Sequence, residues 1–367
     1  MEGSLSPGQI ETLSELGRTL LRSGLPDFFS IYGFDYDRLS ALQFDLSLIP
    51  SSLRPLLQFT LFSEDIDRAN LLAFIPENCL ETLKNLGIAE EMEGRVRLVG
   101  LRLVYHLGVF VFCQPKMKTA HLYYGEDSLA LGRALLGANG TVLDLCAGVG
   151  TQGILCAKTS KRVTSVEAEY RCAYLFWVNA ALNDVYDKVN LQLSDIRNAD
   201  LGANSFDYIC CNPPLLPVPN EVLYPTVGDG GIDGLLIIKE LFPISAKCLS
   251  YKGSCRAIGT VLGTEKEPFL DPLSYLAKEY ELTARIILIG REPLRKGSRM
   301  LHALVSTAAA FNNLPYCDLI QAFSNHYEKQ RATHLYSYLI IINNARSSLD
   351  KFEVINYVWR HSHFWTV

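Results

Sequence analysis

The sequence lacks a long uninterrupted hydrophobic run. Its longest apolar stretch, LRLVYHLGVFVF at residues 101–112, is interrupted by polar residues and is too short to span a membrane. The N-terminus, MEGSLSPGQIETLSEL, has no basic segment followed by an apolar one, so it does not have the pattern of a signal peptide. These absences favour a cytoplasmic protein without a membrane segment.

The sequence also lacks the cysteine and histidine spacings of metal and redox sites. None of its 10 cysteines belongs to a C-x-x-C pair, and several lie inside apolar runs (Cys146, Cys156, Cys210, Cys211 and Cys255). Free cysteine behaves as a small hydrophobic residue, so we expect these thiols to be buried rather than bridged. His361 and His363 have no third ligand nearby in the sequence, and we predict no metal site.

An excess of positive charge is absent as well. The chain has 34 Lys and Arg against 39 Asp and Glu, giving a net charge of −5. Dedicated nucleic-acid-binding proteins usually carry a basic surface, so we expect no nucleic-acid partner on these grounds. The single basic cluster, REPLRKGSR at 291–299, is expected at an exposed turn. A small-molecule or peptide substrate fits the charge better, while the oligomeric state is left open.

Helical patterns and a few short strands occupy the first part of the chain. Residues 8–24 have apolar side chains three and four positions apart and end in glycine, which predicts a helix. Residues 53–63 and 79–87 repeat this pattern, and 93–112 has the character of strands. We therefore predict a small, mainly helical N-terminal domain over 1–118, with a wing-like hairpin and an accessory or substrate-capping role.

From residue 119 onwards, short apolar or β-branched runs alternate with helical stretches. The predicted strands are 141–146, 162–167, 189–194, 206–211 and 254–263, and the predicted helices are 128–137, 151–160, 170–184 and 233–249. Such alternation predicts an α/β fold, a Rossmann-like doubly wound sheet with helices on both faces. We expect it to fill the second domain, 119–367.

The C-terminal part adds further elements to this sheet. Residues 283–290 and 300–308 are predicted to form an antiparallel hairpin at one edge, joined by the basic turn 291–299. A helix over 317–330 and a strand over 335–342 are expected to follow.

The first predicted strand of the sheet runs into the glycine-rich segment DLCAGVGTQG, residues 144–153. Gly148, Gly150 and Gly153 satisfy the pattern G-x-G-x-x-G. Glycines there let the chain turn sharply off a strand and approach a ligand closely in front of a helix. The pattern alone does not distinguish a nicotinamide-dependent dehydrogenase from other nucleotide-binding enzymes.

Three acidic residues bear on this choice, and two of them, Asp144 and Asp195, help to separate the possibilities. Glu167 ends the second strand, where a carboxylate accepts hydrogen bonds from two ribose hydroxyls in either class. Asp144, four residues before the first glycine, suits a ligand with an ammonium and a sulfonium better than a diphosphate. Asp195 follows the third strand, where it would bind an adenine amine or serve only as a turn or cap residue.

The fourth strand ends in an amide followed by two prolines, in FDYICCNPPLL at 206–216. Prolines fix the backbone and supply carbonyl oxygens without competing N–H donors. Asn212 would then present a hydrogen-bond acceptor at the carboxyl edge of the sheet, where ligands bind in such folds. Taken alone, the tetrapeptide NPPL at 212–215 would indicate only a turn that ends the strand.

In order and spacing, the glycine-rich segment, Glu167, Ser194-Asp195 and NPPL at 212–215 together resemble class I S-adenosylmethionine-dependent methyltransferases. The resemblance covers about residues 119–308 and is closest to the N-P-P-[YFWL] branch, which includes protein-glutamine, ribosomal guanine-N2 and N6-adenine DNA methyltransferases. GGIDG at 230–234 and YYGEDSLALGRAL at 123–135 also resemble segments of that branch, the second being the one that closes over the cofactor.

The resemblance implies S-adenosylmethionine as the cofactor and a set of site residues. In the family, the Asn oxygen and the first proline carbonyl accept hydrogen bonds from a planar amino group of the acceptor. The residues implied as catalytic are therefore Asn212 and Pro213, with Tyr124 beside them. The residues implied in cofactor binding are Tyr123, Asp144, Ala147, Gly148, Gly150, Thr151, Glu167, Ala168, Asp195, Ile196 and Asn212.

One position departs from the family. Leu215 stands where members acting on flat bases or amides place an aromatic residue. We therefore expect methyl transfer to a nitrogen, or an oxygen, of a small molecule or peptide. Two other enzymes stay open: a cyclase that converts S-adenosylmethionine into azetidine-2-carboxylate and methylthioadenosine, and a nicotinamide-dependent oxidoreductase. A binding module without turnover is also open, because a fold does not establish function.

Overall fold

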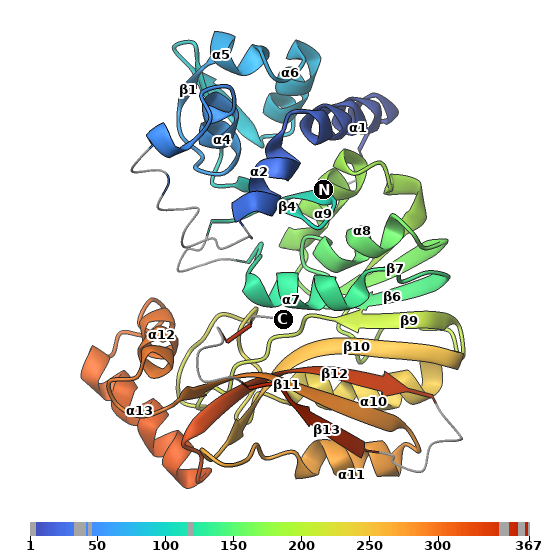
Figure 1. Cartoon of the computed structure of the whole chain (residues 1–367), viewed down its shortest axis with the longest axis vertical. Coiled ribbons are helices and arrows are strands. Elements are labelled where there is room, and N and C mark those ends of the chain that lie inside the picture. The colour runs from blue at the N-terminus through green and yellow to red at the C-terminus, as the bar shows by residue number, and fades with distance from the viewer. Residues whose placement is uncertain are drawn as a thin grey trace.

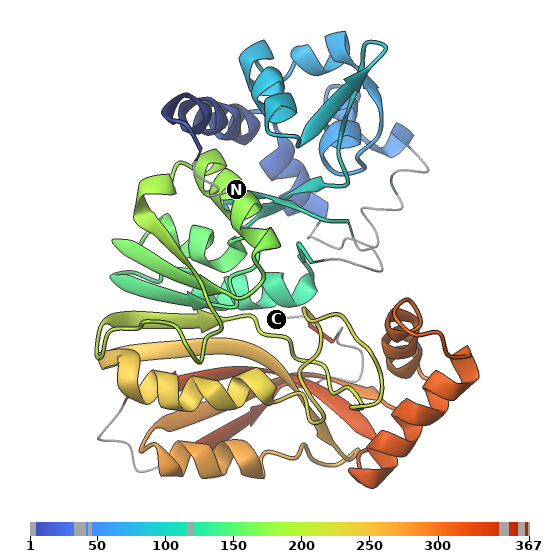
Figure 2. The ribbon, with the colours of Figure 1, turned by 180° about the vertical axis from the view of Figure 1, so that it is seen from behind.

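The computed structural model describes residues 5–32, 42, 46–115, 121–344, 352–358 and 364–365. The N-terminal helices form one end of the molecule, and a large sheet with its helices forms the other (Figures 1 and 2). The predicted domain boundary at 118/119 lies outside the described residues, as do His361 and His363.

Helix α1 (Pro7–Arg22) begins at a well-formed cap. The Ser6 hydroxyl accepts a hydrogen bond from the Gln9 N–H, and Pro7 occupies the first turn, where a missing N–H costs little. The helix packs on α9 (Arg171–Leu182) so closely that a Cβ on Gly17 would lie 1.8 Å from the Leu182 carbonyl oxygen. Only glycine at position 17 permits this close approach of α1 to α9, which covers the large sheet.

Short elements follow α1. The helices are α2 (Leu25–Tyr32), α4 (Arg54–Thr60), α5 (Arg68–Leu72) and α6 (Glu77–Asn85), with a 3-10 turn η2 (Leu46–Leu48). Strands β1 (Ile66–Asp67), β2 (Ala89–Met92) and β3 (Arg95–Leu98) form an antiparallel sheet in the order β1-β3-β2. The helices predicted at 53–63 and 79–87 correspond to α4 and α6.

A two-stranded hairpin, β4 (Arg102–His106) and β5 (Val109–Cys113), connects this part to the rest. The side chain of Asn183 hydrogen-bonds both the N–H and the carbonyl of Phe110, and Asn179 does the same for Phe112. Two buried amides near the end of α9 therefore take the place of a neighbouring strand beside β5.

An eight-stranded mixed sheet forms the centre of the molecule, in the order β13-β11-β12-β10-β9-β6-β7-β8. Its strands are β6 (Thr141–Leu145), β7 (Arg162–Glu167), β8 (Val189–Leu193), β9 (Phe206–Cys211), β10 (Leu249–Gly263), β11 (Thr283–Pro293), β12 (His334–Asn343) and β13 (Phe352–Asn356). The parallel strands β8-β7-β6-β9-β10 have the 3-2-1-4-5 order of doubly wound nucleotide-binding folds. The predicted α/β class is therefore correct.

The predicted hairpin of 283–290 with 300–308 is wrong. Residues 283–290 do form β11, but 300–308 lie in helix α12 (Arg299–Ala308), capped by the Ser298 hydroxyl. Leu301, Leu304, Val305 and Ala308 are buried at helical spacing, a signal that outweighs the β-branched character of the segment. The antiparallel partner of β11 is β12, which lies between β11 and β10.

Helices cover both faces of the sheet, and alternate strand residues pack against each. Val142 and Cys210 belong to the core under α7 (Glu126–Leu135), α8 (Thr151–Ala157) and α9. Leu143 and Cys211 belong to the core under α10 (Leu236–Cys248) and α11 (Asp271–Glu279). A third core joins α12 to α13 (Tyr316–Lys329), and a short 3-10 turn, η3 (Tyr186–Lys188), precedes β8.

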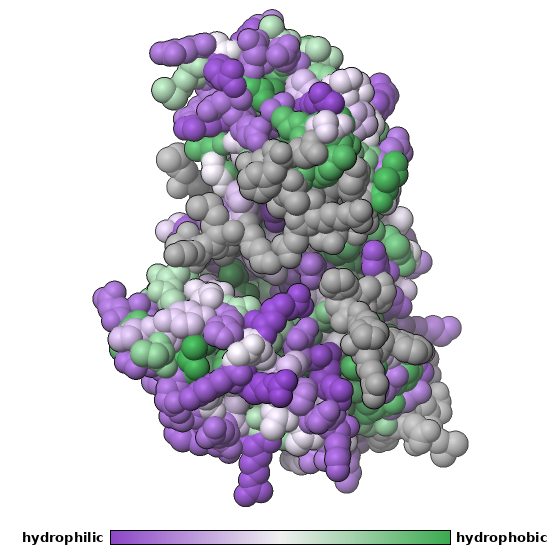
Figure 3. Space-filling view, turned by 60° about the vertical axis from the view of Figure 1, so that its left-hand side comes forward, coloured by the Kyte–Doolittle hydropathy of each residue, from purple (hydrophilic) through white to green (hydrophobic). Residues whose placement is uncertain are grey.

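The molecule has a largely hydrophilic surface and buried thiols, as expected for a globular protein. Hydrophilic side chains cover most of the lower part of the face in Figure 3. All ten cysteines are free, and most of them are buried. Within the described ranges, no helix combines the length and apolar character needed to cross a membrane.

Candidate active site

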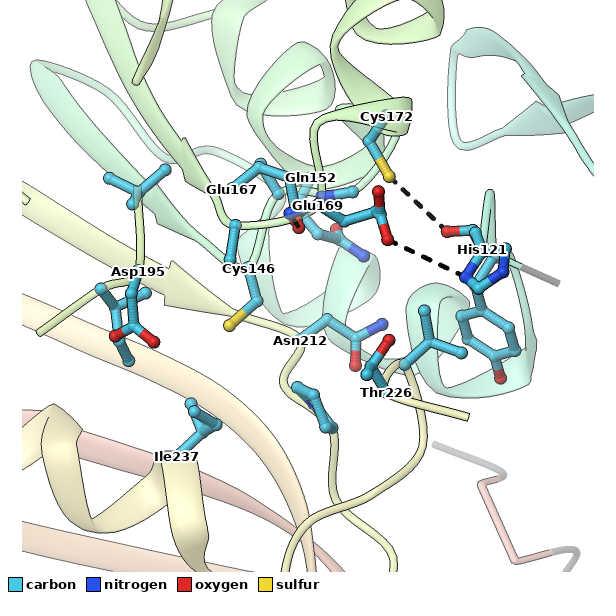
Figure 4. Close-up of a pocket in the computed structure, with 18 of the residues that line it drawn as sticks. His121, Cys146, Gln152, Glu167, Glu169, Cys172, Asp195, Asn212, Thr226 and Ile237 are labelled. Atoms are coloured by element: carbon cyan, nitrogen blue, oxygen red, sulfur yellow. Dashed lines mark hydrogen bonds and ion pairs between the residues drawn. The ribbon is translucent and has the colours of Figure 1, made fainter. Parts of the chain in front are cut away.

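A cavity of about 480 Å³ lies at the carboxyl ends of the parallel strands, where open α/β sheets bind their ligands. In Figure 4, Asp195 and Ile237 lie at one side, His121 at the other, and Asn212 between them. We call the two parts the Glu167 side (Val166, Glu167, Asp195, Ile196 and Ile237) and the Asn212 side (His121, Tyr123, Asn212, Pro214 and Thr226). The volume of the whole cavity lies in the range of small-molecule sites.

Most of the predicted site residues line this cavity. They are Tyr123, Ala147, Gly148, Thr151, Glu167, Ala168, Asp195, Ile196 and Asn212. Four other predicted residues are not part of its lining: Tyr124, Asp144, Gly150 and Pro213.

The glycine-rich segment leaves β6 through three residues with positive φ. Cys146, Gly148 and Gly150 have φ of 57°, 55° and 90°, so the chain turns sharply before α8. At Gly150 a Cβ would lie 2.8 Å from side-chain atoms of Ile154 and Phe176, whereas at Gly148 it would meet open space. Gly150 therefore allows close packing behind the loop, and Gly148 faces the cavity.

Asp144 lies beneath the loop rather than in the cavity. It is 1% exposed, and its carboxylate accepts hydrogen bonds from the Gly153 N–H at 2.9 Å and from the Cys210 thiol at 3.4 Å. Burial raises the pKa of Asp144 to about 7, against the lowering effect of these hydrogen bonds. A Cβ on Gly153 would lie 2.7 Å from Asp144 Oδ2, so the third glycine lets α8 approach this carboxylate.

Glu167 is held by backbone donors at the end of β7. Its Oε2 accepts from the Gly148 N–H at 2.7 Å and its Oε1 from the Glu169 N–H at 2.7 Å. Burial raises the pKa of Glu167, while these hydrogen bonds act in the opposite direction. Each carboxylate oxygen has two lone pairs, so Glu167 retains acceptor capacity toward hydroxyl groups in the cavity.

Asp195 is engaged by a neighbouring cation. Arg197 donates from Nε to Oδ1 at 2.8 Å and from Nη2 to Oδ2 at 2.6 Å. These charge-assisted hydrogen bonds lower the pKa of Asp195 to about 2. Both of its oxygens are therefore partly satisfied, and the expected role toward an adenine amine competes with this pair.

Asn212, directly after β9, has one end tied to the protein and the other end open. Its Nδ2 donates to Asp127 Oδ2 at 3.0 Å and to Ser128 Oγ at 3.1 Å. Its Oδ1 is buried, and no group in the described part of the chain hydrogen-bonds it. An unsatisfied buried oxygen is costly in the absence of a ligand, so the site is arranged to receive a donor there.

The two predicted tyrosines differ in position. Tyr123 lines the cavity, and its hydroxyl donates to Asp127 Oδ1 at 2.7 Å. Tyr124 is 3% exposed and hydrogen-bonds Nδ1 of the fully buried His106 at 2.8 Å. The structure therefore places Tyr124 in the core between β4 and α7, away from the cavity lining, because its ring packs against His106.

The residues after Asn212 also differ from the expectation. The Pro213 side chain is buried outside the lining, and Pro214 lines the cavity instead. Leu215 is 7% exposed and packs in the core, with its carbonyl accepting a hydrogen bond from Thr260 Oγ1. The aromatic ring that the family places after N-P-P therefore has no direct replacement at 215, whereas Tyr123 lies in the cavity wall.

Several lining residues were not predicted. They are His121, Ser128, Cys146, Gln152, Val166, Glu169, Cys172, Arg197, Pro214, Thr226, Val227, Asp229, Leu236 and Ile237. Ser128 belongs to the segment 123–135, which the sequence already suggested as a cover for the cofactor. No local pattern marks Thr226 or Asp229, because the loop that carries them is brought to the cavity by tertiary contacts.

The charge of the lining is mainly negative. Glu167, Glu169, Asp195 and Asp229 contribute carboxylates, and Arg197 is the only Lys or Arg among the described lining residues. Since Arg197 is paired with Asp195, the described lining offers no free cation to a phosphate group. Among the described residues, no cluster of His, Cys, Asp and Glu is suited to hold a metal ion.

A family model described as methyltransferase small domain matches residues 125–221, about a quarter of the chain, from the turn before α7 to the loop after β9. The comparison with curated proteins found no match. The matched segment contains Glu167, Asp195 and Asn212. It supports the resemblance to methyltransferases and agrees with S-adenosylmethionine as the cofactor, while the N-P-P branch stays a prediction.

Solved structures with a similar chain path include three of microbial origin. The YcgJ protein from Bacillus subtilis is 14% identical, with a TM-score of 0.41, covering 60% of this chain and 99% of that one. Trm5b from Pyrococcus abyssi is 17% identical, with a TM-score of 0.40, covering 73% and 71%. TYW2 from M. jannaschii, in complex with AdoMet, is 16% identical, with a TM-score of 0.38, covering 68% and 90%.

Proposed function

We propose that this chain is an S-adenosylmethionine-dependent methyltransferase that methylates a nitrogen, or an oxygen, of a small molecule or peptide. The observation that carries the proposal is the buried Oδ1 of Asn212, an acceptor without a partner among the described residues. It lies in the same cavity as the glycine-rich loop and Glu167.

The Glu167 side fits a nucleoside. Glu167 retains lone pairs for ribose hydroxyls, and Val166, Ile196 and Ile237 offer apolar walls to a planar base. Gly148 leaves open space at the loop, where a Cβ would otherwise project. The acidic lining suits a ligand with an ammonium and a sulfonium, and it disfavours the diphosphate of a nicotinamide cofactor.

When bound, the cofactor supplies a methyl group attached to a positively charged sulfur. The protein's part is to hold the acceptor in line with that methyl group, since alignment of reactants contributes much of the rate in such displacements. Asn212 Oδ1 would accept a hydrogen bond from the acceptor's amino group. The Pro213 carbonyl is the second acceptor that the resemblance implies, although Pro213 itself lies outside the lining. Both groups turn the nitrogen lone pair toward the methyl group.

The acceptor is expected to be neutral or cationic. The described lining has no unpaired Lys or Arg to receive phosphates, which argues against a nucleic acid in this cavity. The position of Leu215 in the core removes the stacking residue that flat bases use in the family, and Tyr123 is the aromatic residue of the lining. A small amine or a peptide side chain fits these walls better.

The test begins with the pure protein and S-adenosylmethionine. We expect S-adenosylhomocysteine to form only when small-molecule or peptide fractions of a cell extract are added, as measured by mass spectrometry. The Asn212→Ala variant is expected to bind the cofactor in calorimetry and to form product about 10²- to 10³-fold more slowly than the wild type. Methylthioadenosine from the cofactor alone, or binding of NADH in place of S-adenosylmethionine, would overturn the proposal.

A further inference from the structure

We propose that Asp127, at the start of α7, is a positioning residue that fixes which end of the Asn212 amide faces the acceptor. This inference rests on the proposed function, because it concerns the residue assigned there to the acceptor. The two residues are 85 positions apart in the sequence, and a direct hydrogen bond joins them.

The contacts account for both ends of the amide. Asn212 Nδ2 donates to Asp127 Oδ2 at 3.0 Å and to Ser128 Oγ at 3.1 Å, so both of its hydrogens have acceptors. Asn212 Oδ1 has no partner in the described chain. The amide is therefore held at its nitrogen end and left open at its oxygen end.

The carboxylate of Asp127 favours this orientation over the reversed one. An ionised carboxylate accepts hydrogen bonds and donates none, so it binds the NH₂ end of the amide and repels the oxygen end. Asp127 is 5% exposed, where the absence of water strengthens both effects. A neutral side chain at 127 would lack this preference.

Asp127 is itself held in place from its other side. The Tyr123 hydroxyl donates to Asp127 Oδ1 at 2.7 Å, so each carboxylate oxygen has its own donor. A Cβ on Gly125 would lie 2.0 Å from the Tyr123 hydroxyl oxygen and 2.6 Å from Asp127 Oδ1. The absence of a side chain at 125 is what lets Tyr123 fold over the carboxylate.

The orientation matters to the acceptor chemistry. An amino group that attacks a methyl group must direct its lone pair at that carbon, which leaves its N–H bonds to be received by acceptor atoms. The Oδ1 atom of Asn212 can accept a hydrogen bond from such an N–H group, whereas Nδ2 cannot. A reversed amide would offer a donor to the nitrogen and would compete for its lone pair.

The first test compares two isosteric variants at adjacent acidic positions. Asp127→Asn replaces the carboxylate by an amide that both donates and accepts, so either orientation of Asn212 becomes possible. We expect turnover of the acceptor found by the extract assay to fall about 10- to 100-fold, the scale of a misaligned reacting group, with cofactor affinity unchanged. Glu126→Gln is the matched control, since Glu126 is exposed and lies outside the lining, and its turnover is expected to equal that of the wild type.

A double variant separates positioning from a general loss of structure. If Asp127 acts through Asn212, then Asp127→Asn combined with Asn212→Ala should turn over no more slowly than Asn212→Ala alone. Additive losses in the double variant would overturn the inference. So would Asp127→Asn with wild-type turnover.

A second readout needs no acceptor. In protein labelled with ¹⁵N-asparagine, the Asn212 side-chain amide signal is assigned by its loss in Asn212→Asp. We expect this signal to be protected from hydrogen exchange in the wild type and in Glu126→Gln, and to lose protection in Asp127→Asn. Unchanged protection would overturn the positioning role. Lost protection in a protein that methylates nothing would uphold the positioning of Asn212 and reject the proposed function.

Discussion

The two sides of the cavity differ in how their polar groups are satisfied. On the Glu167 side, Glu167 receives backbone N–H groups and Asp195 receives a guanidinium. On the Asn212 side, Asn212 keeps a buried oxygen without a partner in the described chain. Both acids of the first side therefore have hydrogen-bond partners within the protein. On the second side, a ligand must donate the hydrogen bond that the buried oxygen of Asn212 lacks.

The two sides also differ in which parts of the chain hold their side chains in place. Glu167 is held by the glycine-rich loop and by the turn after its own strand, so its position depends mainly on nearby backbone. Asn212 is oriented by α7, an element 84 and 85 residues away. Removing a polar side chain on the Glu167 side should accordingly weaken cofactor binding. Removing one on the Asn212 side should slow the reaction step.

The sharpest test of the comparison is Asn212→Ala. We expect turnover to fall by about 10²- to 10³-fold, the cost of removing one preorganised hydrogen-bonding group from a reacting centre. Cofactor affinity, measured by calorimetry, should stay close to that of the wild type. A collapse of cofactor affinity would break the comparison, because Asn212 would then belong to the binding side.

The buried carboxyl group of Asp144, beneath the glycine-rich loop, should affect how the stability of the protein depends on pH. Asp144 has a folded pKa of about 7 against an ordinary value of 3.8, so the folded state holds its proton more tightly than the unfolded state. The free energy of unfolding of the wild type should then fall relative to Asp144→Asn as the pH rises from 4 to 7, by about 2–4 kcal/mol. Chemical denaturation at several pH values measures this difference, and a constant difference would show that Asp144 does not titrate in this range.

Removing the carboxylate at the end of β7 should weaken binding. For Glu167→Ala we expect a cofactor Kd about 10- to 100-fold higher, because two hydroxyl partners and two backbone N–H groups lose a charged acceptor. Glu167→Gln, which keeps the shape and one acceptor oxygen, should lie between this variant and the wild type. Wild-type affinity in Glu167→Ala would reject the ribose assignment.

The smallest effect is expected at Asp195. Its two oxygens are already engaged by Arg197, so a neutral amide at this position should raise the cofactor Kd by only about 2- to 5-fold. Isothermal calorimetry on Asp195→Asn, beside Glu167→Gln, ranks the two acids directly. An effect at Asp195 as large as that at Glu167 would mean that Asp195 leaves Arg197 to bind the base.

Local patterns in the sequence predicted much of the sheet and part of the cavity. The apolar runs 162–167 and 206–211 coincide with β7 and β9, because alternate residues must pack against helices on both faces. The glycine pattern and the acids at strand ends led to the lining residues Gly148, Glu167 and Asp195, since parallel strands end at one edge. Residues 300–308 were predicted as a strand although their apolar spacing also fits the helix they form.

The α/β alternation, the loop after β6 and the amide at the end of β9 follow from local sequence, because each depends on a few neighbouring residues. Tertiary structure alone decided that β12 enters the sheet between β10 and β11, and that Tyr124 turns inward to His106 while Tyr123 covers the cavity. It also decided that Asp127 meets Asn212. Such pairings depend on which distant elements share a buried surface, and burial is what makes a single hydrogen-bond arrangement favourable there.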